Sequence, residues 1–122
     1  MSKDSVIEKR TYVFALRIIK AYKYLCDKGE YVISKQLLRC GTSIGAMMRE
    51  AKFAQSRADF VNKASIALKE ANEALYWIDL LHDSDYLDDA VYKSIYNEAS
   101  AITAILVSIV KSTKANTLKY DS

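Results

Sequence analysis

The stretch LLRCGTSIGAMMREA, Leu37–Ala51, decides the fold because it places two glycines inside a helical pattern. Gly41 and Gly45 stand four residues apart, and no Gly-Lys-Ser/Thr sequence follows them as it would in a phosphate loop. A phosphate loop also needs free backbone N–H groups, which the interior of a helix does not offer. Small residues four apart let another helix backbone approach closely, although each glycine costs about 1 kcal/mol in helix propensity. The stretch therefore predicts a helix that packs tightly against a neighbouring helix.

The rest of the chain has the composition of an all-helical protein. Its 122 residues contain no proline and only three glycines, and strand-and-turn folds depend on both residue types. Apolar residues recur at helical spacing in four segments, which are 5–28, 34–51, 56–82 and the segment from the turn at 83–89 to residue 112. Four amphipathic helices with short connections predict an all-α fold, an antiparallel up-down-up-down four-helix bundle. We expect a single domain over residues 5–112 and a flexible polar tail over residues 113–122.

The segment ends carry start and stop signals that agree with these helices. Gly29 favours a left-handed stop after the first helix, and Ser34 is the predicted N-cap of the second. Ser56–Asp59 has the capping-box form at the start of the third helix, and the acids of the turn Asp83–Asp89 suit the start of the fourth. The predicted core residues, in chain order, are Ile7, Phe14, Ile18, Tyr22, Leu25, Leu37, Gly41, Ile44, Met48, Ala51, Phe60, Ala64, Ala67, Ala71, Leu75, Ile78, Val91, Ile95, Ala99, Ile102, Leu106 and Ile109.

Charge is distributed unevenly along the chain. Residues 1–60 hold 12 Lys and Arg against 6 Asp and Glu, whereas residues 61–122 hold 6 against 9. Such asymmetry indicates either an anion-facing surface or two halves that attract each other. A single bundle would neutralise few phosphates and bind nucleic acid weakly, so the alternative is that these charges serve only solubility. An oligomer would bring several basic surfaces together and so strengthen binding. The candidate nucleic-acid-binding residues are Lys9, Arg10, Arg17, Lys20, Lys23, Lys35, Arg49 and Lys52.

A second stripe lies beside the core face of the third predicted helix. It combines two glutamates with an isoleucine and the only tryptophan. These residues form either an ordinary surface or a subunit interface in which the acids pair with arginines of the second helix or with a lysine. In the second helix, Arg39, Ser43 and Glu50 form a polar stripe that we expect to lock it to the third helix or to a neighbouring subunit. The candidate helix-packing or subunit-interface residues are Arg39, Gly41, Ser43, Gly45, Glu50, Ile66, Glu70, Glu73 and Trp77.

No arrangement of residues indicates catalysis or a metal site. His82 is the only histidine and falls at the predicted end of the third helix, where it suits a capping or surface role, and the Glu-x-x-His motif of di-iron bundles is absent. Cys26 and Cys40 lack CxxC spacing and are predicted as small buried side chains. No apolar run approaches the roughly 18 residues of a membrane span, and the charged N-terminus lacks a secretory apolar core. We therefore expect a cytoplasmic protein without enzymatic activity, metal or cofactor.

Two segments resemble a known family of small helical bundles. YVISKQLLRCGTSIGAMMREA and AQSRADFVNKASIALKEANEALYWIDLL are similar to the 23S rRNA intervening-sequence proteins, whose relative is the accessory variability protein of diversity-generating retroelements. The resemblance covers about residues 9–81 and implies a bacterial four-helix bundle, a ring-like homo-oligomer, commonly a pentamer, and no enzymatic activity. The retroelement relative is basic, binds nucleic acid and works with a reverse transcriptase. The chain departs from the family pattern at Cys40, Met47 and Met48, where a serine and an Asn-Ile-like pair are usual. The matching motif residues are Arg39, Gly41, Ser43, Gly45, Glu50, Lys69, Glu70, Glu73 and Trp77.

The basic first half and the resemblance together predict a function. We expect a non-enzymatic homo-oligomer that binds RNA or DNA through the basic faces of its first two helices. Its expected partners are further copies of the chain, RNA or DNA, and a nucleic-acid-processing protein, with no membrane. The alternative is an oligomeric scaffold or adaptor for a protein partner, in which the charges serve only solubility.

Overall fold

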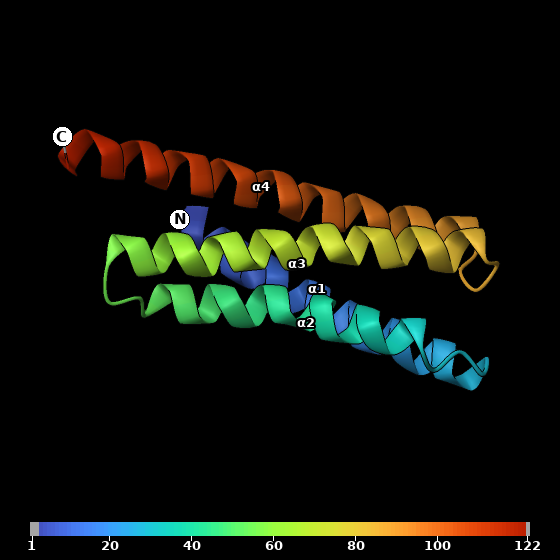
Figure 1. The fold of residues 1–122 in the computed structure, drawn as a ribbon. Coiled ribbons are helices and arrows are strands. Elements are labelled where there is room, and N and C mark those ends of the chain that lie inside the picture. The colour runs from blue at the N-terminus through green and yellow to red at the C-terminus, as the bar shows by residue number, and fades with distance from the viewer. Residues whose placement is uncertain (1–2, 122) are drawn as a thin grey trace.

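The computed structural model describes the backbone of residues 3–121 and the side chains of residues 6–115. Its helices are α1 (Lys3–Asp27), α2 (Ile33–Lys52), α3 (Arg57–Asp83) and α4 (Asp89–Asp121). Consecutive helices run antiparallel, so the α1–α2 and α3–α4 turns lie at the same end of the molecule (Figure 1). Helix α2 packs between α1 and α3, while α4 packs along α3 and makes a smaller contact with α1. The prediction of an all-α four-helix bundle is confirmed.

The turn between α1 and α2 confirms one predicted signal and shows that another is wrong. Gly29 has a φ of +84° and ends α1 in the left-handed conformation, as predicted. Ser34 is not the N-cap of α2, because the buried carboxylate of Glu30 accepts the N–H groups of Val32, Ile33 and Ser34 at 3.1, 2.8 and 2.6 Å. The Ser34 hydroxyl instead donates to the Glu30 carbonyl at 2.8 Å. One carboxylate thus satisfies several free N–H groups, whereas a serine would satisfy only one.

The start of α3 follows its predicted capping motif. Ser56 has an extended backbone, and its side-chain oxygen accepts the N–H of Asp59 at 3.1 Å. The Asp59 carboxylate reaches back to the N–H of Gln55 at 3.2 Å, one residue before the position of an ideal capping box. The chain reversal between α2 and α3 is therefore fixed by short-range hydrogen bonds.

Helix α4 begins as predicted and runs further than predicted. The Asp88 carboxylate accepts the N–H of Val91 at 2.8 Å, which places the acids of the turn at the positive end of the helix. We expected the helix to end near Ser112, but it continues to Asp121. The residues between them contain no proline or glycine, so no strong helix-ending signal is present.

Alanines form the centre of the core on α3. Ala64, Ala67, Ala71 and Ala74 are completely buried, and such short side chains let α2 and α4 approach the α3 backbone closely. The predicted core residues that are not fully buried are Tyr22, Phe60, Leu75 and Val91. In the part of the chain that the structure describes, no helix is both long enough and apolar enough to cross a membrane.

Helix α2 meets α1 at its two glycines. A Cβ atom built on Gly41 would lie 2.9 Å from both Cγ atoms of Ile18, which is closer than real side chains come. A Cβ atom on Gly45 would lie 3.4 Å from the carbonyl oxygen of Thr11, an ordinary contact distance. The close helix approach expected from the glycine spacing is thus tightest at Gly41.

Candidate functional site

The side of α1 that faces away from the core carries large apolar side chains. Leu16 is 52% exposed and Tyr12 is 60% exposed, although both lie in the middle of the helix. We call this surface the α1 outer face, and its apolar residues are Val6, Tyr12, Val13, Leu16, Ile19 and Tyr24. The opposite side of the same helix is buried in the bundle through Phe14 and Ile18. A surface helix normally presents polar residues to water. Helix α1 instead has a second apolar side that is not buried in the bundle.

Lysines are interleaved with the apolar residues of the α1 outer face. Lys9, Lys20 and Lys23 are exposed and, among the residues that the structure describes, form no ion pair. Lys35 in the first turn of α2 is likewise exposed without a paired acid in the described part of the chain. The sequence placed these four lysines among the candidate nucleic-acid-binding residues, and the structure leaves their charges free for another molecule.

The other predicted basic residues contact groups within the same chain. Arg10 forms a two-pronged ion pair with Glu98 at 2.7 and 3.1 Å, which raises the pKa of Arg10 above its ordinary value. Arg17 donates to the hydroxyl of Ser94 at 2.5 Å. Both contacts join α1 to α4, where the two helices pack over a smaller area than their neighbours do. Arg10 and Arg17 are therefore engaged within the chain, unlike the lysines of the α1 outer face.

Two further predicted basic residues share a single acid. Arg49 lies 3.3 Å and Lys52 lies 3.6 Å from the carboxylate oxygens of Glu8 on α1. Both cations remain more than half exposed, so they reach solvent even while paired. They hold α1 against α2 and contribute less net positive charge to the surface than the four unpaired lysines do.

A groove separates α1 from α4 next to the α1 outer face. It has a volume of about 520 Å³. Its lining residues are Arg17, Lys20, Ala21 and Tyr24 from α1, and Leu87, Asp88, Ala90, Val91, Ser94 and Ile95 from the α3–α4 turn and α4. Lys20 and Tyr24 belong to both surfaces, so the groove continues the α1 outer face. It also explains why Val91 is 40% exposed rather than buried as predicted, because Val91 lines this groove instead of the core.

The predicted polar stripe of α2 lies against α3 of the same chain. Arg39 forms ion pairs with Glu70 at 3.1 Å and with Glu73, and the indole N–H of Trp77 donates to Glu73 at 3.0 Å. The hydroxyl of Ser43 donates to the carbonyl oxygen of Arg39 at 2.6 Å.

A second ion pair extends this contact toward the α2–α3 turn. Glu50 pairs with Lys63 at 3.1 Å. Trp77 and Ile66 are half-buried, and Trp77 contacts Tyr76 edge-to-face with ring centroids 5.1 Å apart. The stripe on α2 and the stripe on α3 thus hold these two helices together.

Cys40 lies at the same helix contact and has the character of a structural thiol. It is completely buried, and burial raises the pKa of its thiol to about 12. A reactive cysteine needs an accessible thiolate, so the environment of Cys40 disfavours that chemistry. Cys26 is only partly buried, which differs from its predicted burial.

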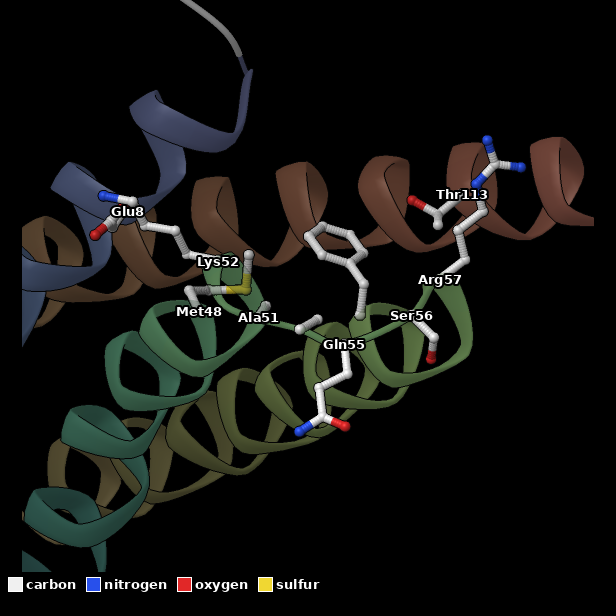
Figure 2. A pocket seen from close by; sticks show the side chains of 10 residues that line it. Glu8, Met48, Ala51, Lys52, Gln55, Ser56, Arg57 and Thr113 are labelled. Carbon is white, nitrogen blue, oxygen red and sulfur yellow. The ribbon is translucent and has the colours of Figure 1, made fainter.

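An open cleft of about 450 Å³ lies at the α2–α3 turn (Figure 2). Met48 and Ala51 form part of its wall, and Glu8 and Lys52 lie side by side at one edge. Arg57 lies at the other edge, toward α4. The cleft mixes charges of both signs, and no group of three or more His, Cys, Asp or Glu residues in the described chain is placed to hold a metal ion.

The α1 outer face is the feature that sequence reasoning missed. The run YVFALRII, Tyr12–Ile19, contains only one charged residue and is therefore apolar on more than one side of a helix. The charged residues around this run predict a surface, but Phe14 and Ile18 are the only residues of the run that the predicted core includes. This run is apolar over more than the one side that a bundle buries, and that width predicts an exposed apolar surface on the first helix.

Comparisons with known proteins agree with the fold. A family model described as 23S rRNA-intervening sequence protein matches residues 3–108. The chain is similar to a solved structure described as a protein with unknown function from the S23 ribosomal protein family of Bacteroides thetaiotaomicron VPI-5482. The two chains share 51% identity with a TM-score of 0.88, and the similarity covers 90% of this chain and 99% of the other. No curated protein matches this chain.

Proposed function

The chain belongs to the 23S rRNA-intervening sequence protein family, and we propose that it works without catalysis, by assembling with copies of itself and binding RNA or DNA. The observation that carries this proposal is the α1 outer face, where exposed apolar side chains alternate with lysines that have no acid partner among the described residues. The apolar residues supply the driving force for assembly, and the lysines supply the charge for phosphate binding.

Assembly follows from the concentration of exposed apolar residues on one helix. Of the eleven large apolar side chains exposed in the described chain, six lie on α1, whereas the others lie singly or at turns. Single exposed apolar residues are normal in monomeric proteins, but a continuous stripe marks an interaction surface. The α1–α4 groove beside the stripe adds an indented apolar surface that a second copy can fill.

Nucleic-acid binding depends on assembly because each copy offers few free charges. Four unpaired lysines on α1 and α2 neutralise too few phosphates for tight binding by one chain. An oligomer brings several such sets together, and binding strength rises steeply with the number of phosphates contacted.

Assembly can be tested by light scattering after size exclusion. Leu16→Glu places a charge in the middle of the α1 outer face, and we expect its mass to fall to that of a single chain. Tyr76→Glu is the matched control, because Tyr76 is 57% exposed on α3, outside the proposed interface. A wild-type protein that is monomeric, or equal masses for both variants, would refute this part of the proposal.

Nucleic-acid binding can be tested by fluorescence anisotropy on RNA and DNA over a salt series. The double variant Lys20→Gln and Lys23→Gln should weaken binding and reduce the salt slope by about 2 per bound chain, since each contacted duplex phosphate contributes roughly 0.9. Lys69→Gln with Lys93→Gln removes the same charge from α3 and α4 and serves as the control. The mass of each variant must match that of the wild type, so that lost binding is not lost assembly.

One observation favours a second function, an assembled scaffold for a protein partner. Three of the predicted nucleic-acid-binding cations, Arg10, Arg49 and Lys52, have acid partners within the chain. If the wild type assembles but binds neither RNA nor DNA at low salt, the scaffold function replaces nucleic-acid binding.

A further inference from the structure

The only histidine of the chain bridges the end of α3 and the start of α4. His82 lies in the last turn of α3, and its Nε2 atom is 2.7 Å from a carboxylate oxygen of Asp89, the first residue of α4. Its Nδ1 atom is 3.2 Å from a carboxylate oxygen of Asp83. The ring also stacks on Tyr92 of α4, with centroids 3.9 Å apart and planes inclined by 15°. A single side chain at the end of α3 therefore contacts the first turn of α4 directly.

The chemistry of an imidazole ring makes this arrangement depend on protonation. Both ring nitrogens face carboxylate oxygens, which only accept hydrogen bonds. The imidazolium ion donates an N–H to each carboxylate, whereas a neutral ring donates only one and turns a lone pair toward the other carboxylate. Loss of the proton thus removes both ion pairs and one of the two hydrogen bonds.

Tyr92 and Asp89, which contact the His82 ring, both have shifted pKa values that hold their charge states constant near neutrality. Tyr92 donates its hydroxyl to Asp79 at 2.7 Å, and this bond, with burial, raises the pKa of Tyr92 to about 12. The hydrogen bond to His82 lowers the pKa of Asp89, so that carboxylate stays ionised. The other charged or titratable groups near the ring are Asp83 on α3, Lys93 on α4 and Tyr96, which contacts Tyr92. His82 is the one group of this cluster whose ordinary titration range lies near neutrality.

We propose that protonated His82 is a clasp that fastens the first turn of α4 to the end of α3, and that loss of its proton releases this turn. This first turn contains Ala90 and Val91, and Leu87 and Asp88 directly precede it; all four residues line the α1–α4 groove. The clasp therefore makes the shape of the groove sensitive to pH near neutrality. This inference rests on the ring contacts alone and does not require nucleic-acid binding.

The direction of the pH effect follows from the two carboxylates. The hydrogen bond to Asp89 raises the pKa of His82 most, burial opposes it, and the bond to Asp83 adds to it, so the folded value lies above the ordinary value of about 6.5. A group with a raised folded pKa contributes its full stabilisation below the unfolded value. That stabilisation disappears as the pH rises through the folded pKa, so the clasp is closed in weak acid and opens toward alkaline pH.

Nuclear magnetic resonance can test the clasp on the full chain, because one histidine gives one titrating ring signal. We expect His82 to titrate above pH 6.5. We also expect the hydrogen-exchange protection of amides 92–95 to fall about two- to five-fold, relative to the α2 amides, as the ring loses its proton.

Two conservative variants separate the clasp from a general charge effect. Asp89→Asn removes the charge that faces Nε2, so it should lower the His82 pKa and reduce the pH dependence of protection. Asp85→Asn is the control, because Asp85 is exposed in the same turn, forms no ion pair with the ring and has a φ of +69° that asparagine tolerates. The clasp is refuted if His82 titrates at or below its ordinary value, or if the two variants shift it equally.

Discussion

Replacing Gly41 by alanine should destabilise the bundle, whereas the same replacement at Gly45 should leave its stability unchanged or raise it. Both glycines lie inside α2 and face α1, so the two variants make the same substitution in the same helix against the same neighbouring helix. The difference lies in the space that a methyl group would find. At Gly41 the added carbon would lie 2.9 Å from two carbons of Ile18, and at Gly45 it would lie 3.4 Å from a carbonyl oxygen of Thr11.

The magnitudes follow from two opposing terms. Alanine gains about 1 kcal/mol over glycine in the interior of a helix. Overpacking a buried contact costs about 1–3 kcal/mol, and Ile18 is fully buried and β-branched, so it cannot rotate away without leaving its preferred rotamer. The Cβ of Ile18 is also within 3.3 Å of the new carbon, so the helices themselves must move. We expect Gly41→Ala to lose about 1 kcal/mol and Gly45→Ala to gain up to about 1 kcal/mol.

Urea unfolding followed by circular dichroism measures both changes, at one protein concentration because assembly would couple stability to concentration. A double-mutant cycle isolates the clash. Ile18→Ala removes the two obstructing carbons, and although it destabilises the core by about 2–5 kcal/mol, Gly41→Ala should become stabilising in that background. Equal effects of alanine at both glycines, or no coupling between Gly41 and Ile18, would show that the reasoning about close approach is wrong.

Four further changes test the contacts that fix the helices. Burial opposes the charge of Glu30, but the N–H bonds it accepts hold its pKa below the ordinary value. Glu30→Gln should therefore cost about 1 kcal/mol of stability near neutrality, and it should flatten the loss of stability as the pH falls through the folded pKa. Urea unfolding at several pH values measures both effects. Arg39→Met leaves two carboxylates unpaired and should cost about 1 kcal/mol in the same assay, partly recovered by adding Glu73→Gln. Trp77→Ala should lose roughly 2 kcal/mol of half-buried packing, seen as a lower melting temperature. Gly45→Leu should weaken folding or assembly where alanine does not, because its longer side chain meets the α1 backbone; unchanged melting and unchanged mass by light scattering would contradict this.

Helical periodicity and composition were sufficient to predict the fold, because both report on local properties of the chain. The start of α2 shows what residue propensities alone do not predict, which is the side chain that caps the helix. Ser34 is a good N-cap by residue type, but the carboxylate of Glu30, four residues earlier, accepts the N–H groups at the start of α2 instead. N-cap preferences describe the residue at the cap position and do not cover a side chain that far away. The capping motif at Ser56 was predictable because its partner, Asp59, is part of the same short motif.

The candidate site was harder to predict, because helical spacing tells which side chains share a face and not what that face meets. The spacing predicts one polar stripe with Arg39 and another with Glu70 and Glu73, and it leaves open which cation pairs with the acids. Only the fold shows that Arg39 meets both glutamates within one chain. On α1 the lysines predict an outer surface, but charge alone does not predict that exposed apolar residues lie between them. The partner of Arg10, Glu98, is 88 residues away, and helical spacing within α1 gives no information about a partner at that distance.

The unpaired charges and the unburied apolar surface lie on the same helix face, and lysine chemistry reconciles their two roles. A lysine has a four-carbon stem that packs along apolar surface while its ammonium group stays in water. In an assembly that buries Leu16 and Val13, the stems of Lys9 and Lys20 can cover the edge of the contact and leave their charges at its rim. The ammonium groups of neighbouring copies would then follow the contact line. Burial of the apolar stripe would gather positive charge instead of hiding it, which is why assembly and phosphate binding are expected to strengthen each other.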